Sequence, residues 1–255
     1  MPDPIITVAV PSLNQGRFLD KALRSISEQG LPAEVFVLDG GSTDQSVDVI
    51  RRWENRLSGW RSRPDRGQAA AINEGIARGR APYVCWLNAD DYYLTRGIET
   101  LIRALERAPE APAAYGCCWT VTSSGRRAFR YPTLRFRPWV LANFCFICQP
   151  GTVIRRTAWE SVGGLNEDLH VALDYDLWWR LYGAFGALEY TPEFVAAAVM
   201  HSETKTATKR REHYLEAMAV VRQHTGRTPL KWYLAWPFMV NAREWIRAWA
   251  DKFGA

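Results

Sequence analysis

The amino-acid sequence predicts an α/β fold, in which a mixed, mainly parallel β-sheet is flanked by helices and followed by a C-terminal helical extension. Short apolar runs alternate with segments of helical periodicity through the first half of the chain. This order is typical of right-handed βαβ units with parallel strands. Each apolar run ends in polar residues, as strands do at the ligand-binding edge of an open α/β sheet. Residues 204–255 are mostly helical in pattern.

The first half of the chain carries the parallel pattern. Each strand is a β-branched or apolar run, and each helix has apolar residues at helical spacing. Strands are expected at 5–10, 35–38, 60–62 and 83–87, with helices around 18–26, 47–53, 69–75 and 98–105.

The rhythm then changes. A Ser-Ser-Gly turn at 123–125 between two strand-like runs predicts a hairpin. Further strands are expected at 149–156 and 193–200, and further helices at 158–162, 174–181 and 204–223. We expect one continuous domain over residues 1–203 and a helical appendage over 204–255.

Composition excludes several classes of protein. The chain has 255 residues, of which 47% are hydrophobic and 23% charged, as in ordinary globular proteins. No run of eighteen apolar residues occurs, and the first residues lack a signal-peptide pattern. The five cysteines are expected to be buried thiols rather than zinc or redox pairs. These observations favour a cytoplasmic protein.

The charge is concentrated near the C-terminus. The formal net charge is +5, and residues 201–255 hold ten basic and five acidic side chains. This distribution argues against a general nucleic-acid surface and favours a local basic patch.

Polar residues at the strand ends predict a binding site. Asn14, Asp39, Asp65, Asp90 and Asp91 should all meet at one edge of the parallel sheet. The adjacent carboxylates of Asp90 and Asp91 repel each other unless a cation or hydrogen-bond donors lie between them. The pair therefore indicates a metal or nucleotide site, or alternatively a loop whose aspartates cap the next helix.

Two common nucleotide-binding motifs are absent from the sequence. No G-x-G-x-x-G follows the first strand, and G-x-x-x-x-G-K-[ST] does not occur. A dinucleotide-dependent dehydrogenase and a P-loop NTPase are therefore disfavoured.

Four short segments, in this order, resemble the nucleotide-binding half of family 2 glycosyltransferases, which have a GT-A fold. A fifth segment resembles the acceptor side of that family, and the resemblance covers about residues 4–202. The segments are VPSLNQGRFLDKALRSI, VLDGGSTDQS, DRGQAAAINEG and WLNADD, followed by VGGLNEDLHVALDYDLWWRL. The resemblance implies a GT-A catalytic domain over 1–203, with its nucleotide-binding half at about 1–93 and its acceptor half at 94–203.

The resemblance implies roles for the nucleotide side. Pro11, Ser12 and Asp39 should line the base and ribose of a nucleotide-diphospho-sugar, and Asp39 should accept a hydrogen bond from a uracil N–H. The alternative for Asp39 is a helix cap or an Asx-turn. Asp65 and Gln68 should belong to the same wall, although Asp65 could instead cap its helix.

The resemblance also implies a metal site. Asp91 should ligate a divalent cation that bridges the two phosphates, and Asp90 should hold the ribose or a metal-bound water. Oxygen ligands favour Mg²⁺ or Mn²⁺, and an imidazole from His201 would tilt the preference toward Mn²⁺. Asn88 departs from the family, since many relatives have an acidic residue there. The amide of Asn88 should bind the nucleotide or the backbone. The site then carries one negative charge fewer than in those relatives.

The acceptor side should supply a general base. The resemblance implies that this base is Asp174. Relatives usually have Glu-Asp at these two positions, and this chain has Leu173 in place of the Glu. Asp176 is the alternative base, although a residue in the first turn of a helix is also favoured there by the helix dipole or as a structural partner. Two tryptophans, Trp178 and Trp179, follow in the same helix. At least one is expected to pack in the core, and the other could stack on a sugar.

Residues 231–253 are aromatic and basic. A helical stripe there suits a peripheral contact with the inner face of a membrane, or packing on the catalytic domain or on a second subunit. The stripe comprises Ala242, Trp245, Ile246, Trp249 and Phe253.

The expected function is inverting transfer of a hexosyl or N-acetylhexosaminyl group from a UDP- or dTDP-sugar to a sugar or lipid-linked acceptor, in polysaccharide or glycolipid biosynthesis. Two alternatives are a sugar-nucleotide nucleotidyltransferase and a non-catalytic nucleotide-sugar-binding protein of the same fold.

Overall fold

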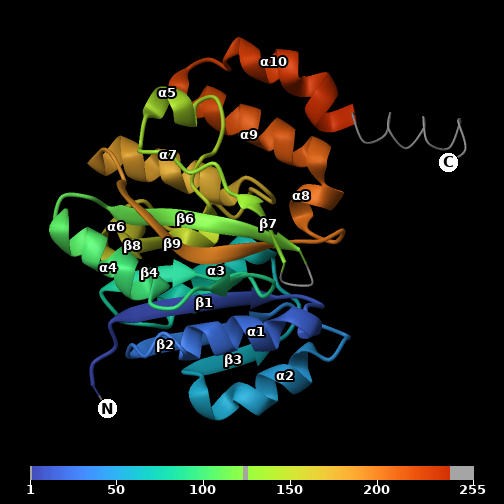
Figure 1. Ribbon diagram of the computed structural model, residues 1–255. Helices are drawn as coiled ribbons and strands as arrows, with labels where there is room; N and C mark the ends of the chain where they lie inside the picture. Colours follow the sequence, from blue (N-terminus) through green and yellow to red (C-terminus); the bar gives the residue numbers. More distant parts are fainter. Residues whose placement is uncertain (1, 123–125, 242–255) are drawn as a thin grey trace, which may run out of the picture.

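The computed structural model describes residues 2–122 and 126–241. Within these residues a single sheet of nine strands forms the centre of the molecule (Figure 1). Its order is β3 (Gly59–Ser62), β2 (Ala33–Asp39), β1 (Ile6–Ser12), β4 (Tyr83–Trp86), β8 (Thr152–Arg155), β6 (Ala113–Thr122), β9 (Glu189–Met200) and β5 (Tyr92–Tyr93), with β7 (Arg127–Arg130) paired to β6.

The sheet combines a parallel half with a mixed half, which confirms the expected mixed α/β fold. Strands β3, β2, β1 and β4 are parallel neighbours. Strand β8 runs antiparallel to both β4 and β6, whereas β6 and β9 are parallel. The hairpin predicted around residues 123–125 is confirmed by the antiparallel pairing of β6 with β7, and its turn lies outside the described residues.

Helices cover both faces of the sheet (Figure 1). Successive side chains of a strand point to opposite faces, so Val8 and Val10 pack with α1 and α4 while Ala9 packs with α3. One face carries α1 (Gly16–Ser27), α2 (Ser46–Trp53) and α4 (Gly97–Arg107), and the other carries α3 (Gln68–Ala77), α6 (Arg156–Ser161) and α7 (Leu173–Phe185).

A further helical layer lies on the side of α7 away from the sheet (Figure 1). Tyr214 and Val221 of α9 and Trp232 of α10 belong to the same apolar cluster as α7 and β4. This layer comprises α5 (Pro138–Leu141), α9 (Arg210–Thr225), α10 (Leu230–Trp236) and a π-helical turn (Pro237–Asn241), with α8 (Lys205–Thr208) before α9; short 3-10 helices lie at Glu54–Arg56 and Gln149–Gly151.

One sequence expectation is corrected, and another falls outside the described residues. The continuous helix expected over 204–223 is wrong, because the chain leaves helical geometry at Lys209 (φ −115°, ψ 41°) between α8 and α9. The stripe predicted from Ala242 to Phe253 lies outside the described residues. No helix among the residues that the structure describes is long and apolar enough to cross a bilayer.

The two adjacent tryptophans of α7 both pack in the core. Trp178 is fully buried and stacks on Trp86, with ring centroids 6.1 Å apart. Trp179 is also buried and stacks on His224 at 6.0 Å. Core packing is therefore confirmed for both, and Trp178 supports Trp86, which forms part of the cavity described next.

Candidate active site

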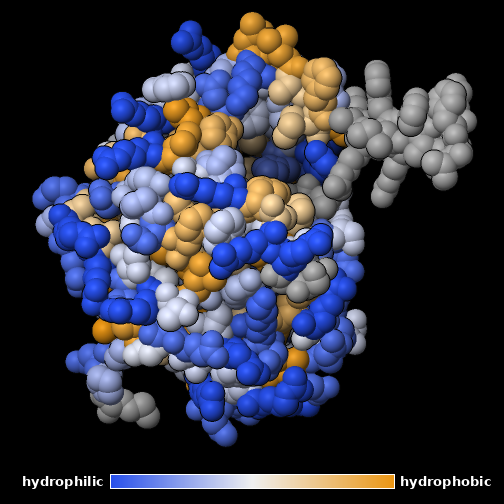
Figure 2. Space-filling model, in the orientation of Figure 1, coloured by the Kyte–Doolittle hydropathy of each residue, from blue (hydrophilic) through white to orange (hydrophobic). Residues whose placement is uncertain are grey.

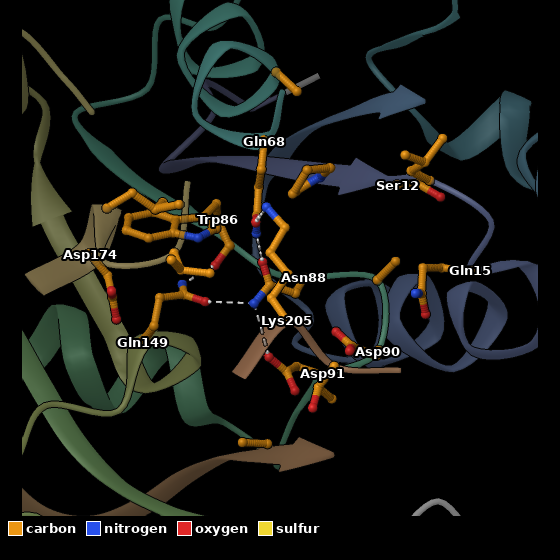
Figure 3. A pocket seen from close by; sticks show the side chains of 18 of the residues that line it. Ser12, Gln15, Gln68, Trp86, Asn88, Asp90, Asp91, Gln149, Asp174 and Lys205 are labelled. Carbon is orange, nitrogen blue, oxygen red and sulfur yellow. Dashed lines mark hydrogen bonds between the residues drawn. The ribbon is translucent and has the colours of Figure 1, made fainter. Parts of the chain in front are cut away.

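A cavity of about 490 Å³ opens where β1 and β4 end and where α3 and α7 begin. Both halves of the chain contribute to its wall. Figure 3 shows Ser12 and Gln15 at one side and Asp174 at the other, with Asn88 and Asp91 between them. Of the residues singled out from the sequence, the wall contains Pro11, Ser12, Asp65, Gln68, Asn88, Asp90, Asp91 and Asp174. Asp39 and His201 are not part of the wall. Asp39 lies between Leu38 and Gly40, which are, and His201 lies against Asp90.

The β1–α1 connection presents unsatisfied polar atoms to the cavity. Ser12 Oγ and Gln15 Oε1 are buried and have no hydrogen-bond partner. Buried polar groups are normally paired, so these two atoms are available to a polar ligand. The connection is tight because a side chain at Gly16 would place its Cβ 2.6 Å from the backbone nitrogen of Ser46.

Asp39 organises the loop after β2 rather than facing the cavity. Its carboxylate is fully buried and accepts hydrogen bonds from the N–H of Ser42 at 2.9 Å and from Ser62 Oγ at 2.6 Å. It also accepts from the N–H of Gly41 at 3.1 Å, in the Asx-turn geometry weighed as the alternative. A direct contact between Asp39 and a nucleotide base stays a prediction, while Gly40 lines the cavity.

Asp65 makes a local hydrogen bond in the loop before α3 and also lies in the wall. One carboxylate oxygen accepts from the N–H of Gly67 at 2.9 Å, directly before α3, and the other lies 3.0 Å from the guanidinium of Arg61. The ion pair fixes the carboxylate at the edge of the cavity, and Asp65 makes no side-chain cap to α3.

A chain of hydrogen bonds crosses the floor of the cavity (Figure 3). Lys205 Nζ donates to Gln68 Oε1 at 2.6 Å, and Gln68 Nε2 donates to Asn88 Oδ1 at 2.8 Å. Asn88 Nδ2 then lies 3.3 Å from both Gln149 Oε1 and Asp91 Oδ2. Asn88 is thus a donor to two acceptors, which an acidic residue at this position would not be.

The two adjacent aspartates differ in environment. Burial, together with the charge of Asp90, raises the pKa of Asp91 well above its usual value. Asp91 Oδ1 accepts from the backbone N–H of Val199 at 2.9 Å. Asp90 Oδ2 lies 3.0 Å from His201 Nε2, and the His201 ring packs against Phe18 at 4.7 Å. A buried carboxylate beside a second carboxylate and an imidazole is a set of atoms that a divalent cation would stabilise.

Protein side chains alone do not complete a metal cage. No group of three His, Cys, Asp or Glu side chains with metal-binding geometry occurs within residues 2–122 and 126–241. Mg²⁺ and Mn²⁺ are commonly held by one or two carboxylates together with substrate phosphates and water. Asp91, with Asp90 and His201 adjacent, fits that kind of site.

Asp174 lies on the acceptor side of the cavity, in the first turn of α7. Burial raises the pKa of its carboxyl group to about 6. Its Oδ1 accepts from the N–H of Tyr175 at 2.9 Å. A carboxylate with a pKa near neutrality is suited to take a proton at working pH.

Asp176, the alternative base, is engaged elsewhere. It is buried, and its oxygens lie 2.7 Å from Arg180 Nε and 3.0 Å from His224 Nε2. Burial opposes ionisation, but His224 and Arg180 lower its pKa overall. This geometry corresponds to the structural-partner alternative.

Several residues at the site were not singled out from the sequence. Gln15, Gln149, Lys205 and His213 line the cavity. Glu216 lies behind it and accepts from the N–H groups of 170–172. Lys205 follows the predicted His201 closely and could have been flagged, whereas Glu216 meets its partners only through the packing of α9.

The sequence of the chain matches a known family and several curated proteins. The model of the family described as Glycosyl transferase family 2 matches residues 7–163. The chain is 21% identical to hyaluronan synthase of Pasteurella multocida over 240 residues, which are 90% of this chain and 24% of that protein. It is 21% identical to chondroitin synthase of Escherichia coli over 247 residues, covering 94% of this chain and 35% of that protein. The chain therefore spans a quarter to a third of these relatives.

Solved structures share the fold. TarS of S. aureus in complex with UDP superposes with a TM-score of 0.67 at 18% identity, covering 86% of this chain and 65% of that one. The mannosyltransferase PcManGT from Pyrobaculum calidifontis, in complex with GDP-Man and Mn²⁺, superposes with a TM-score of 0.66 at 20% identity, covering 100% of this chain and 77% of that one. These matches confirm the GT-A fold.

Proposed function

The chain belongs to glycosyl transferase family 2, and from that premise we propose that it is an inverting transferase. It would move a hexosyl or N-acetylhexosaminyl group from a UDP- or dTDP-sugar to the hydroxyl of a sugar or lipid-linked acceptor. One observation carries the proposal: the acidic pair of Asp90 and Asp91 and a carboxylate with a pKa of about 6, that of Asp174, lie in the wall of one cavity.

The sugar-nucleotide is assigned to the side formed by β1 and α3. Pro11 and Ser12 would line the base and ribose, and the unpaired Ser12 Oγ and Gln15 Oε1 supply hydrogen-bonding atoms there. Gln68 and Lys205 would face the phosphates. Lys205 Nζ already donates to Gln68, so both side chains are held in place before a ligand binds.

The phosphates are assigned to the acidic pair. Asp91, with His201 and Asp90, would hold a divalent cation, and that cation would neutralise charge developing on the departing diphosphate. The raised pKa of Asp91 supports this assignment because the buried carboxylate has no cationic side chain as its partner among the described residues. The Mn²⁺ named with PcManGT supports a metal for the same fold.

Asp174 is assigned as the general base. Its carboxylate would take the proton from the acceptor hydroxyl as that oxygen bonds to the anomeric carbon. The bond from this carbon to the diphosphate oxygen breaks, and its electron pair leaves with the nucleoside diphosphate. Attack opposite the leaving group inverts the configuration. A general base of this kind typically contributes about 10²–10⁴-fold in rate.

The test is release of nucleoside diphosphate from a panel of nucleotide sugars, with and without Mn²⁺. We expect turnover of a UDP- or dTDP-sugar by the native chain and a loss of at least about 10²-fold in Asp174→Asn. Asp168→Asn, an exposed carboxylate on the same segment, is the matched control and should retain full activity. Pyrophosphate formed from a nucleoside triphosphate and a sugar phosphate would identify a nucleotidyltransferase, and binding without turnover would identify a non-catalytic protein.

A further inference from the structure

Exposed apolar side chains gather on one face of the helical layer. Of the twelve large hydrophobic side chains that are exposed among the described residues, seven come from two segments. Phe238 is 73% exposed and Trp139 is 69% exposed. The set, called here the α5–α10 face, comprises Leu134, Trp139, Leu230, Tyr233, Leu234, Phe238 and Met239. Figure 2 shows apolar atoms at the top of the molecule, over α10.

The two segments are held together by specific contacts. Trp232 Nε1 donates to the carbonyl of Ala142 at 2.8 Å, and Lys231 Nζ donates to the carbonyl of Asn143 at 3.1 Å. Both donors belong to α10, and both acceptors directly follow α5. The two helices therefore form one surface. The face is therefore built by the fold and does not consist of scattered apolar residues.

The two chain segments that form this face carry charge of one sign. Residues 111–159 and 217–241 contain no Asp or Glu. Within residues 134–139 and 227–239, which include the exposed apolar side chains, the exposed cations are Arg135, Arg137, Arg227 and Lys231. Large apolar surfaces on soluble proteins mark contact sites, and segments that carry only cationic charge favour an anionic partner.

We propose that the α5–α10 face docks on the surface of an anionic phospholipid bilayer. Tryptophan, tyrosine and leucine next to arginine and lysine are the side chains that enter the region between headgroups and acyl chains. A second copy of the chain fits less well, because a two-fold interface would bring the same arginines against each other. The bilayer supplies both the apolar region and the negative charge.

Docking would bring the bilayer close to the acceptor side of the cavity. Tyr175 Oη donates to the carbonyl of Leu141, the last residue of α5, and Tyr175 adjoins Asp174. Only this consequence rests on the proposed transferase function. Binding to vesicles is measured without sugar-nucleotide or acceptor, so a negative result there leaves the transferase proposal standing.

The test is co-sedimentation of the full chain with vesicles. We expect binding to phosphatidylcholine vesicles that contain phosphatidylglycerol, little binding to pure phosphatidylcholine, and release by high salt. Arg137→Gln and Arg227→Gln should each weaken binding about fivefold. Replacing Trp139 and Phe238 by serine should weaken it about tenfold or more.

A matched variant keeps the test specific. Phe129→Ser removes a phenylalanine that is 50% exposed on β7 and should leave vesicle binding unchanged. Circular dichroism confirms that each variant is folded. Equal binding of native chain and the Trp139 and Phe238 variant would overturn the proposal. So would a dimer in sedimentation equilibrium that the same variant dissociates while the native chain ignores anionic vesicles.

Discussion

Glu216 accepts a hydrogen bond from the backbone N–H of Ala172 at 2.9 Å, two residues before Asp174 in the chain. The same carboxylate accepts from the N–H of Val171 at 2.8 Å and from that of His170. Three consecutive N–H groups in the loop that leads into α7, the last of them at the N-cap Ala172, are thus paired with a residue of α9. Although burial alone would raise the pKa of Glu216, these backbone hydrogen bonds lower it. The C-terminal helices therefore set where the proposed base lies.

Glu216→Gln should slow the reaction without weakening donor binding. An amide has one acceptor oxygen and no charge, so the start of α7 loses part of its anchoring. We expect kcat to fall about tenfold, equivalent to about 1.4 kcal/mol, while KM for the sugar-nucleotide changes less than about twofold. Steady-state kinetics measure both. Glu212→Gln, on the same helix and paired with Lys209, is the control. A change confined to KM would contradict the assignment.

The rate should depend on pH through Asp174. The base acts only when ionised, and burial raises its pKa to about 6. We therefore expect kcat/KM at saturating metal to rise about tenfold per pH unit below pH 6 and to level off above pH 7. A rate profile from pH 5 to 8.5 measures this. A rate already level at pH 5 would exclude Asp174 as the titrating base.

The same group should make stability depend on pH with the opposite sign. The folded-state pKa of about 6 lies above the usual value of 3.8, so the folded state binds this proton more tightly than the unfolded state. The stabilisation is complete below about pH 4 and is lost as the pH rises to about 6. Asp174→Asn should then raise the free energy of unfolding at pH 7.5 by about 1–3 kcal/mol and change it little at pH 4. Urea titrations at both pH values test the difference.

The parallel half of the fold could be predicted from sequence because its information is local. A run such as 83–87 is apolar throughout, and a strand buried on both faces needs that pattern. Pro11 and Ser12 end β1, Asn88 and Asp91 follow β4, and parallel strands bring their ends to one edge. The cavity wall on this side was therefore foreseeable from strand ends alone.

The remaining contacts depend on packing between distant segments. Glu216 meets its backbone partners across 44 to 46 residues, and no local pattern marks it. Asp39 ends a strand, as ligand-binding residues do, and its carboxylate also accepts hydrogen bonds from two serines, one of them from β3. Whether a carboxylate at a strand end faces a ligand or its own loop depends on neighbours that sequence order does not reveal.

Removing the charge of Asp91 should separate stability from metal response. The buried carboxylate is costly when ionised, because burial and Asp90 both oppose its charge. Asp91→Asn keeps an oxygen for the N–H of Val199 and should raise the melting temperature in EDTA. We expect it to abolish the rise that Mn²⁺ and UDP together give the native chain, a rise that follows from ligand binding to the folded state. Differential scanning fluorimetry measures both, and an undiminished response to Mn²⁺ would remove Asp91 from the metal site.

Asn88→Asp should lower the stability of the fold in the absence of metal and lower it less when metal is bound. The amide of Asn88 donates to Asp91 Oδ2 and Gln149 Oε1, and a carboxylate would instead face two acceptors. We expect the free energy of unfolding in EDTA to fall by about 2 kcal/mol through lost hydrogen bonds and like-charge repulsion. Because the added negative charge attracts a cation, Mn²⁺ with UDP should recover most of that loss. Asn88→Ala loses the same hydrogen bonds without adding charge, so Mn²⁺ with UDP should stabilise it no more than it stabilises the native chain; an equal gain in the two variants would contradict a cation site beside Asn88.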